Sequence, residues 1–97
     1  MAEKYEIALQ SNRSFMEFEV DLSSTILTVS LHWNVEGDYY MVKLSKDGVM
    51  LAGGLGLHPN IDLLRFLKLG VGKLYLEGHE ATPDTLGIKN RLVYESV

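Results

Sequence analysis

Residues 14–52 read SFMEFEVDLSSTILTVSLHWNVEGDYYMVKLSKDGVMLA, and apolar residues occupy every second position over most of this stretch. A period of two is typical of strands that bury one face and leave the other face in water. Asp47-Gly48 separates two of the alternating runs, and an Asp-Gly pair in this position is a strong signal for a hairpin. We therefore expect a meander of about four antiparallel strands between residues 14 and 52.

Shorter runs on both sides of this meander also have the character of strands. Glu6–Leu9, Lys73–Glu77 and Arg91–Glu95 each carry apolar side chains at alternate positions. Together with the meander they make about seven short strands, which is typical of a small all-β sandwich or barrel. We expect residues 1–97 to form a single β-rich domain, because a chain of 97 residues has about the usual size for one core.

Residues 60–68 have a different pattern, which predicts one short helix. Asn60 is a good residue to cap the start of a helix, and the carboxylate of Asp62 suits its positive end. Lys68 and Gly70 suit the opposite end. The expected fold class is therefore mainly β: a small antiparallel β-sandwich or partly open barrel of about seven short strands, with one short helix near residues 60–68.

Composition argues against several classes of partner. The 97 residues include 9 Lys or Arg and 13 Asp or Glu, so the formal net charge is −4, and the basic residues do not cluster. Because phosphate neutralisation supplies most of the affinity for nucleic acid, we expect no nucleic-acid partner. No apolar run reaches the length of about 18 residues that a membrane helix needs, so we expect no helix that spans a membrane. The scattered basic residues also argue against binding to an anionic membrane, so we expect no membrane partner. The chain has no cysteine, which excludes disulfides and thiolate zinc sites.

Residues that could carry chemistry are present but do not form a recognisable motif. Glu17 and Glu19 share one strand face, yet an alternating acidic face is more often simply solvated than catalytic. The three histidines, His32, His58 and His79, lack the close spacing of metal ligands. The glycines of residues 53–56 and 70–72 favour bulges or close backbone approach over a phosphate site. We therefore expect no catalytic, cofactor-binding or metal-binding residue and no enzymatic activity.

The aromatic and apolar residues divide into one core position and several surface positions. Trp33 follows Leu31 in the inward phase of its run, which predicts a buried core anchor. Exposed tyrosine and apolar side chains are typical of protein interfaces, so the outward positions are candidate contacts. The candidate interface consists of Ile26, Tyr39, Tyr75 and Val93.

A series of short segments follows one order along almost the whole chain. The segments are Leu27 to Trp33-Asn34, Gly37, Tyr39-Tyr40, Asp47-Gly48, Leu51-Ala52-Gly53, Leu57, Asp62-Leu63-Leu64, residues 69–75, Leu86-Gly87 and residues 91–94. In this combination the chain resembles the phage baseplate plug family, which comprises small structural proteins of contractile-tail baseplates. The resemblance extends from Ile7 to Tyr94.

The resemblance implies a non-enzymatic structural and assembly component of a phage or prophage-derived contractile tail baseplate. Such a protein would act through contacts with other baseplate or tail proteins. The resemblance leaves open whether several copies of the chain form an oligomer inside the assembly. It would lie in the tail baseplate of the virion and, during assembly, in the cytoplasm of the host bacterium. The alternative is a β-barrel module that binds a small ligand or a sugar, with the aromatic residues as its platform.

Overall fold

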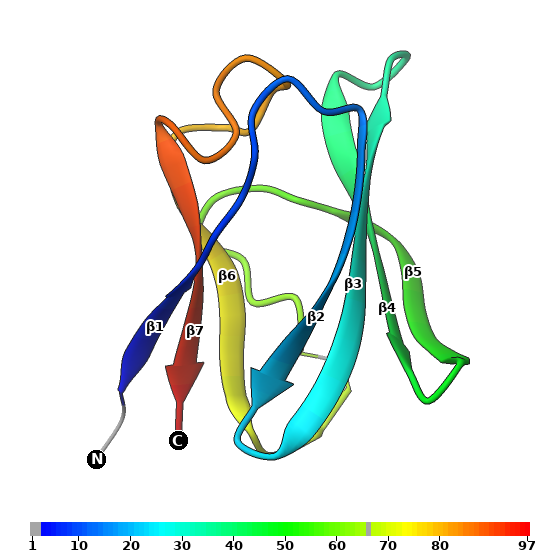
Figure 1. Ribbon diagram of the computed structural model, residues 1–97, viewed down its shortest axis with the longest axis vertical. Coiled ribbons are helices and arrows are strands. Elements are labelled where there is room, and N and C mark those ends of the chain that lie inside the picture. Colours follow the sequence, from blue (N-terminus) through cyan, green and yellow to red (C-terminus); the bar gives the residue numbers. More distant parts are fainter. Residues whose placement is uncertain (1–2, 66) are drawn as a thin grey trace.

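The computed structural model describes residues 3–65 and 67–97, and these residues form seven strands in two antiparallel sheets (Figure 1). The strands are β1 (Lys4–Ile7), β2 (Phe15–Leu22), β3 (Thr25–Asn34), β4 (Tyr39–Lys46), β5 (Val49–Gly56), β6 (Gly72–Gly78) and β7 (Asn90–Ser96). The mainly β fold class is therefore confirmed, with the number of strands that the alternation predicts.

The first sheet is the expected meander. Its strand order is β2-β3-β4-β5, so each strand pairs with its neighbours in the sequence. Asp47 and Gly48 form the turn between β4 and β5 with φ angles of 51° and 80°. Positive φ at both central residues is the geometry of the tight hairpin turn that best matches the twist of the strands. The Asp-Gly signal thus predicted this hairpin correctly.

The second sheet joins the two ends of the chain. Its order is β1-β7-β6, and β1 pairs antiparallel to β7. Figure 1 shows this sheet facing the four-stranded sheet, with the N-terminal and C-terminal strands side by side. Among the described residues no strand of one sheet pairs with a strand of the other, so the architecture is a sandwich and not a closed barrel.

The core lies between the two sheets, and the period of two explains its composition. Leu27, Val29 and Leu31 of β3 all have 0% of their surface exposed, while the residues between them point outward. The opposite sheet contributes Leu74 and Leu76 of β6 in the same way. Connecting segments complete the cluster with Leu57, Leu63, Leu64, Val71, Ala81 and Leu86. Burial of these side chains is the dominant favourable contribution to folding.

The helix expected near residues 60–68 does not form in the described part of this segment, where the chain follows a series of turns. Phe66 belonged to that prediction and lies outside the described residues. Asn60 has a φ of 63° and Lys68 a φ of 53°. A helix-capping residue normally has an extended backbone and a helical residue a negative φ, so neither position suits the predicted helix.

Hydrogen bonds to β6 explain why this segment is not helical. The N–H of Asn60 donates to the carbonyl of Leu76 at 2.8 Å, and the N–H of Leu63 donates to the carbonyl of Leu74 at 2.7 Å. Asp62 Oδ1 accepts from the backbone N–H of Leu74 at 3.0 Å and of Leu64 at 2.9 Å. The groups that a helix would use internally therefore bind the edge of a sheet. No helix long and apolar enough to cross a membrane occurs in the part of the chain that is described.

Candidate docking surfaces

The four predicted interface residues lie on two opposite outer faces of the sandwich. Ile26 of β3 and Tyr39 of β4 point outward from the four-stranded sheet. Tyr75 of β6 and Val93 of β7 are register partners on the outer face of the three-stranded sheet. The four residues therefore do not form one continuous surface, and their role as contact residues stays a prediction.

Val93 requires a correction. It lies in the outward phase of β7, as expected, but only 4% of its surface is exposed. Its strand is the central one of three, and its register partners are Glu6 on β1 and Tyr75 on β6. Because larger side chains on both flanking strands cover it, Val93 does not offer the accessible apolar contact that its phase suggested. Tyr75 is itself partly buried, and its hydroxyl donates to Glu95 Oε1 at 3.1 Å.

On the outer face of the three-stranded sheet, charged side chains of opposite sign pair with one another. Arg91 on β7 donates through Nε to Glu77 Oε1 on β6 at 2.7 Å. The same guanidinium lies 3.7 Å from Glu6 Oε1 on β1. The hydrogen bond with Glu77, together with the charge of that carboxylate, raises the pKa of Arg91 above its ordinary value. One arginine thus connects all three strands across a face that water covers.

Tyr39 is held at the end of the four-stranded sheet by residues that the sequence pattern did not single out. Its ring lies against the imidazole of His58, with 5.6 Å between the ring centroids. His58 Nδ1 is 2.9 Å from Glu80 Oε1, so the contact continues into the loop after β6. One side of the Tyr39 ring is therefore already in contact with its own chain. Because His58 and Glu80 are far apart in sequence, only the fold reveals this cluster.

Trp33, the predicted core anchor, packs against the core but is not fully enclosed. Its ring meets that of Tyr40 edge-on, with centroids 5.0 Å apart. Tyr40 has 0% of its surface exposed, and its hydroxyl donates to the carbonyl of Arg13 at 2.5 Å. The most deeply buried aromatic residue at this end of the core is thus Tyr40, and Trp33 covers it.

A hollow of about 420 Å³ lies on the outer face of the four-stranded sheet. Phe15, with 55% of its surface exposed, and Met50, with 62%, contribute apolar side chains from the two outermost strands. The remaining lining residues are Ser30, His32, Met41, Val42, Lys43, Gly53 and Gly54. This surface was not predicted from the sequence. The available signal was an apolar residue in the outward phase of a strand, as at Phe15 and Met41.

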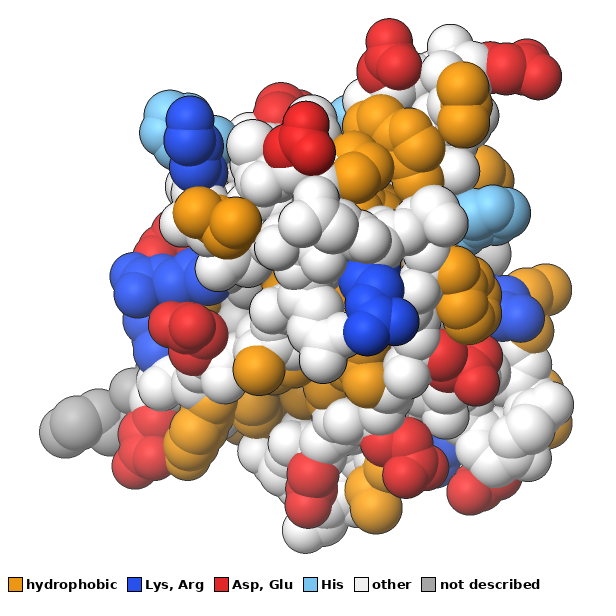
Figure 2. Space-filling view, turned by 45° about the horizontal axis from the view of Figure 1, so that its top comes forward, with side chains coloured by type: hydrophobic (Ala, Val, Ile, Leu, Met, Phe, Trp, Pro, Cys, Tyr) orange, Lys and Arg blue, Asp and Glu red, His pale blue; other side chains and the backbone are white. Residues whose placement is uncertain are grey.

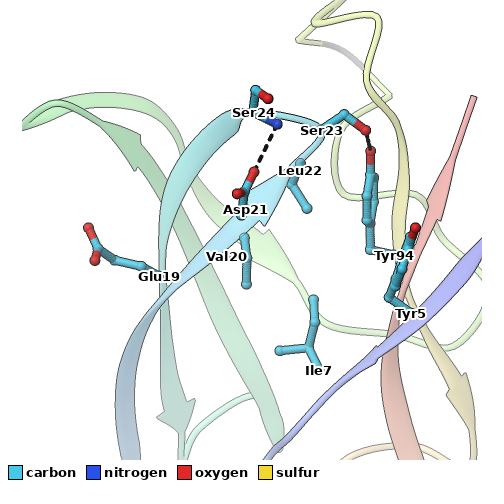
Figure 3. A pocket seen from close by; sticks show the side chains of 9 residues that line it. All are labelled: Tyr5, Ile7, Glu19, Val20, Asp21, Leu22, Ser23, Ser24 and Tyr94. Carbon is cyan, nitrogen blue, oxygen red and sulfur yellow. Dashed lines mark hydrogen bonds between the residues drawn. The ribbon is translucent and has the colours of Figure 1, made fainter.

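A second hollow, of about 560 Å³, lies between the edges of the two sheets. Figure 3 shows Tyr5 and Ile7 of β1 on one side and Val20 and Leu22 of β2 on the other. Glu19 and Asp21 of β2 also line the hollow, together with Ser23, Ser24 and Tyr94. Both hollows have volumes typical of binding sites, which range from about 300 to 1,000 Å³.

The face of the molecule drawn in Figure 2 carries charged side chains of both signs. Figure 2 shows acidic, basic and hydrophobic side chains interspersed on one face, without an extended patch of one sign. Within residues 3–65 and 67–97, no group of three or more His, Cys, Asp or Glu side chains could hold a metal ion. The features that stand out are therefore surfaces and hollows rather than a cluster of reactive groups.

The fold and these surfaces define a small all-β sandwich protein with several hollows on its surface, among them the two described above. A family model described as "Cyanophage baseplate Pam3 plug gp18" matches residues 4–97. The chain therefore belongs to this family of cyanophage baseplate plugs, as the resemblance predicted. A search of the curated proteins gave no match.

Proposed function

We propose that this protein is a structural plug component of a phage tail baseplate that acts through contacts with neighbouring baseplate proteins and not by catalysis. The observation that carries the proposal is the match of residues 4–97 to a family of baseplate plugs. The proposed location is the tail baseplate of the virion, with the cytoplasm of the host bacterium as the site of assembly. We further propose that the whole chain acts as one β-rich domain, since both sheets contribute to one core.

The structure supports this proposal through its packed core and its surfaces. A sandwich with a closed core loses little conformational freedom on docking, which favours binding. A stable protein interface covers about 800 Å² on each partner. On an accessible surface of 5873 Å², such an interface would occupy about one seventh of the molecule. Two or three partners can therefore contact the protein at once. We propose Ile26, Tyr39 and Tyr75 as contact residues, without the buried Val93, and Ile26, with 53% of its surface exposed, is the most accessible of the three.

Gene deletion and complementation test the proposal. Tail particles from a phage that lacks the gene are compared with particles from the same phage supplied with the protein from a plasmid. Mass spectrometry of purified particles should detect the protein in the complemented sample, at a fixed ratio to other baseplate proteins. The deletion should reduce the yield of complete, infectious particles. Absence of the protein from complemented particles, with full infectivity after deletion, would remove the proposal.

A further inference from the structure

Four of the described strands lie at a sheet edge, and three of these edges are protected. The edge of β6 is covered by residues 59–63, of which Asn60 and Leu63 donate backbone hydrogen bonds to it. β1 has only 4 residues, and Lys4 and Glu6 are among them. β2 carries Glu17, Glu19 and Asp21 in alternation. Short edges, covered edges and charged edges are the usual means by which proteins prevent unwanted strand pairing.

The fourth edge, β5, has none of these protections. It runs for 8 residues, Val49–Gly56, without a charged side chain. Val49 and Met50 have 63% and 62% of their surfaces exposed. In the part of the chain that is described, no backbone group of this strand bonds to a segment other than β4. Figure 1 shows β5 at the margin of the molecule with nothing beside its outer edge. The pairing of β5 with β4 shifts register between Val42 and Leu44 and between Leu44 and Ser45, so the free edge is regular in short stretches and not over its whole length. An open, uncharged edge is nevertheless a template for an added strand along such stretches.

The hollow on the outer face of the same sheet reaches this edge. Gly53 and Gly54 line it and are exposed, so no side chain separates the free edge of the strand from the hollow at these positions. Phe15, Met41 and Met50 supply apolar walls. A strand added to β5 would therefore direct its outward side chains over the two glycines and towards these walls.

The charge of Lys43 indicates which charge a strand added beside β5 would carry. It is the only lysine or arginine among the residues described as lining the hollow, and no aspartate or glutamate lines it. Glu17 of β2 lies in the same register row, two strands away on the side opposite β5, but its Oε2 accepts from Ser30 Oγ at 3.0 Å and it forms no ion pair with Lys43. On the side of β5, which has no charged residue, the ammonium group of Lys43 has no acidic neighbour. A strand beside β5 would lie roughly 10 Å from β4, which is two inter-strand spacings. The side chains of a lysine and a glutamate together bridge that distance. An acidic residue on the added strand would thus neutralise Lys43.

We propose that the free edge of β5 binds an extended segment of a neighbouring baseplate protein as a fifth strand of this sheet. The segment carries a large apolar side chain, which fills the hollow, and a carboxylate, which pairs with Lys43. This inference rests on the proposed function and adds to it the surface used and the chemistry of the partner. The outer face of the three-stranded sheet also has a hollow, of about 410 Å³, but Glu77 and Glu95 line it together with Lys4 and Lys73, so both signs of charge are already present there. The edge of β6 beside that hollow is covered by the segment that contains Asn60 and Leu63.

Photo-crosslinking inside assembled particles tests the proposal. A benzophenone amino acid replaces Met50 in the plasmid-encoded protein, and in a matched control it replaces Ile88, which has 68% of its surface exposed and lies outside the hollow. Particles assembled with each variant are irradiated, and the crosslinked peptides are identified by mass spectrometry. We expect position 50, and not position 88, to crosslink to one segment of one other baseplate protein, with an acidic residue close to the crosslinked site.

A charge reversal provides the second measurement. Lys43→Glu should reduce the yield of this crosslink by about tenfold or more, because like charges brought together in an interface are costly. Lys89→Glu, outside the hollow, should leave the yield unchanged. Three outcomes would overturn this inference and leave the proposed function standing. Position 50 could crosslink to a second copy of this chain, both positions could crosslink equally, or the protein could enter particles without any crosslink from position 50. Failure of the unmodified protein to enter particles would instead overturn the proposed function.

Discussion

The hydroxyl oxygen of Tyr94 lies 2.6 Å from Oγ of Ser23, and this contact joins the two sheets of the sandwich (Figure 3). Tyr94 belongs to β7, whereas Ser23 lies in the turn between β2 and β3. The tyrosine hydroxyl donates its single hydrogen to the carbonyl of Val71 at 2.5 Å. The hydroxyl of Ser23 must therefore be the donor to Tyr94. One buried oxygen thus connects three segments that are distant in the sequence.

Tyr94→Phe should lower the free energy of unfolding by about 1–2 kcal/mol. The substitution removes both hydrogen bonds and leaves the carbonyl of Val71 without the partner that Tyr94 provides. Chemical denaturation followed by circular dichroism measures the change. Tyr5→Phe is the matched control, since Tyr5 is 50% exposed and its hydroxyl donates to the side chain of Glu3 and to no other described residue. Equal stability of the two variants would show that the contact between the sheets contributes nothing.

Tyr40 should make the protein sensitive to alkaline pH. Burial of its hydroxyl, and secondarily the charge of Asp84, raise the pKa of Tyr40 above the ordinary value of 10.0. Below pH 10 both the folded and the unfolded forms carry a neutral tyrosine. Above pH 10 the unfolded form ionises first, so stability should fall as pH rises from 10 through the higher pKa of the folded form.

Tyr40→Phe isolates this effect. At neutral pH the variant should lose about 1 kcal/mol, because the hydrogen bond to the carbonyl of Arg13 disappears. Between pH 10 and pH 11 the wild-type protein should lose up to about 1 kcal/mol more than the variant, because the unfolded tyrosine is already half ionised at pH 10. Denaturation curves at pH 8, 10 and 11 provide the measurement. Parallel loss of stability in both proteins would contradict the assignment to Tyr40.

Trp33→Ala should destabilise the protein by about 2–3 kcal/mol, which is at or below the lower end of the range for fully buried aromatic residues. Trp33 packs against the core but is only partly buried, and its main aromatic contact is the ring of Tyr40. Because it is the single tryptophan of the chain, its fluorescence reports on the same environment. Emission at the wavelength of a fully exposed indole, or a loss below about 1 kcal/mol, would contradict the packing described.

The strands were predictable because burial of one sheet face requires an apolar residue at every second position of the sequence. Leu27, Val29 and Leu31 alternate with less apolar residues, and the structure buries all three. The hairpin at Asp47-Gly48 was predictable because few residues tolerate its backbone geometry. In both cases the determining interaction lies within a few residues of the signal.

Other features depend on partners that are distant in the sequence. Asn60 and Asp62 have the character of a helix start, but β6 provides competing hydrogen-bond partners some 12 or more residues away. The last residues of β5, Gly53–Gly56, were not predicted as strand, because glycine is rare in strands. Alternation identified Tyr75 and Tyr39 as outward residues but carries no information on which sheet each residue belongs to. The candidate interface therefore divided between two faces.

Asp62 can be tested as the residue that holds the non-helical segment to β6. Asp62→Ala should lower the free energy of unfolding by about 1–2 kcal/mol, since the N–H groups of Leu64 and Leu74 lose their acceptor. Asp62→Asn retains an oxygen in the same position and should lose less than half as much. Urea denaturation of both variants provides the comparison. If the two variants were equally destabilised, the charge of Asp62 and not its geometry would be the source of its effect.

Gly72 should be among the least replaceable residues of the chain. It begins β6 with a φ of 123°, and a Cβ atom at this position would lie 2.1 Å from the backbone carbonyl oxygen of Glu95. That oxygen belongs to the neighbouring strand β7, so it cannot move aside without breaking the register of the two strands. Gly72→Ala should therefore destabilise by about 3 kcal/mol or more, because the strain of the backbone and the clash add together.

Gly48→Ala separates these two contributions. Gly48 also has a positive φ, of 80°, but a Cβ atom there would meet no atom within 4 Å. The substitution should lose only about 1–2 kcal/mol, which is the cost of the left-handed backbone alone. Thermal and chemical denaturation of the two variants measure the difference. If Gly72→Ala were no more destabilising than Gly48→Ala, the close approach between β6 and β7 would have to relax at this position, and the pairing of Gly72 with Ser96 at the end of the sheet would be adaptable rather than rigid.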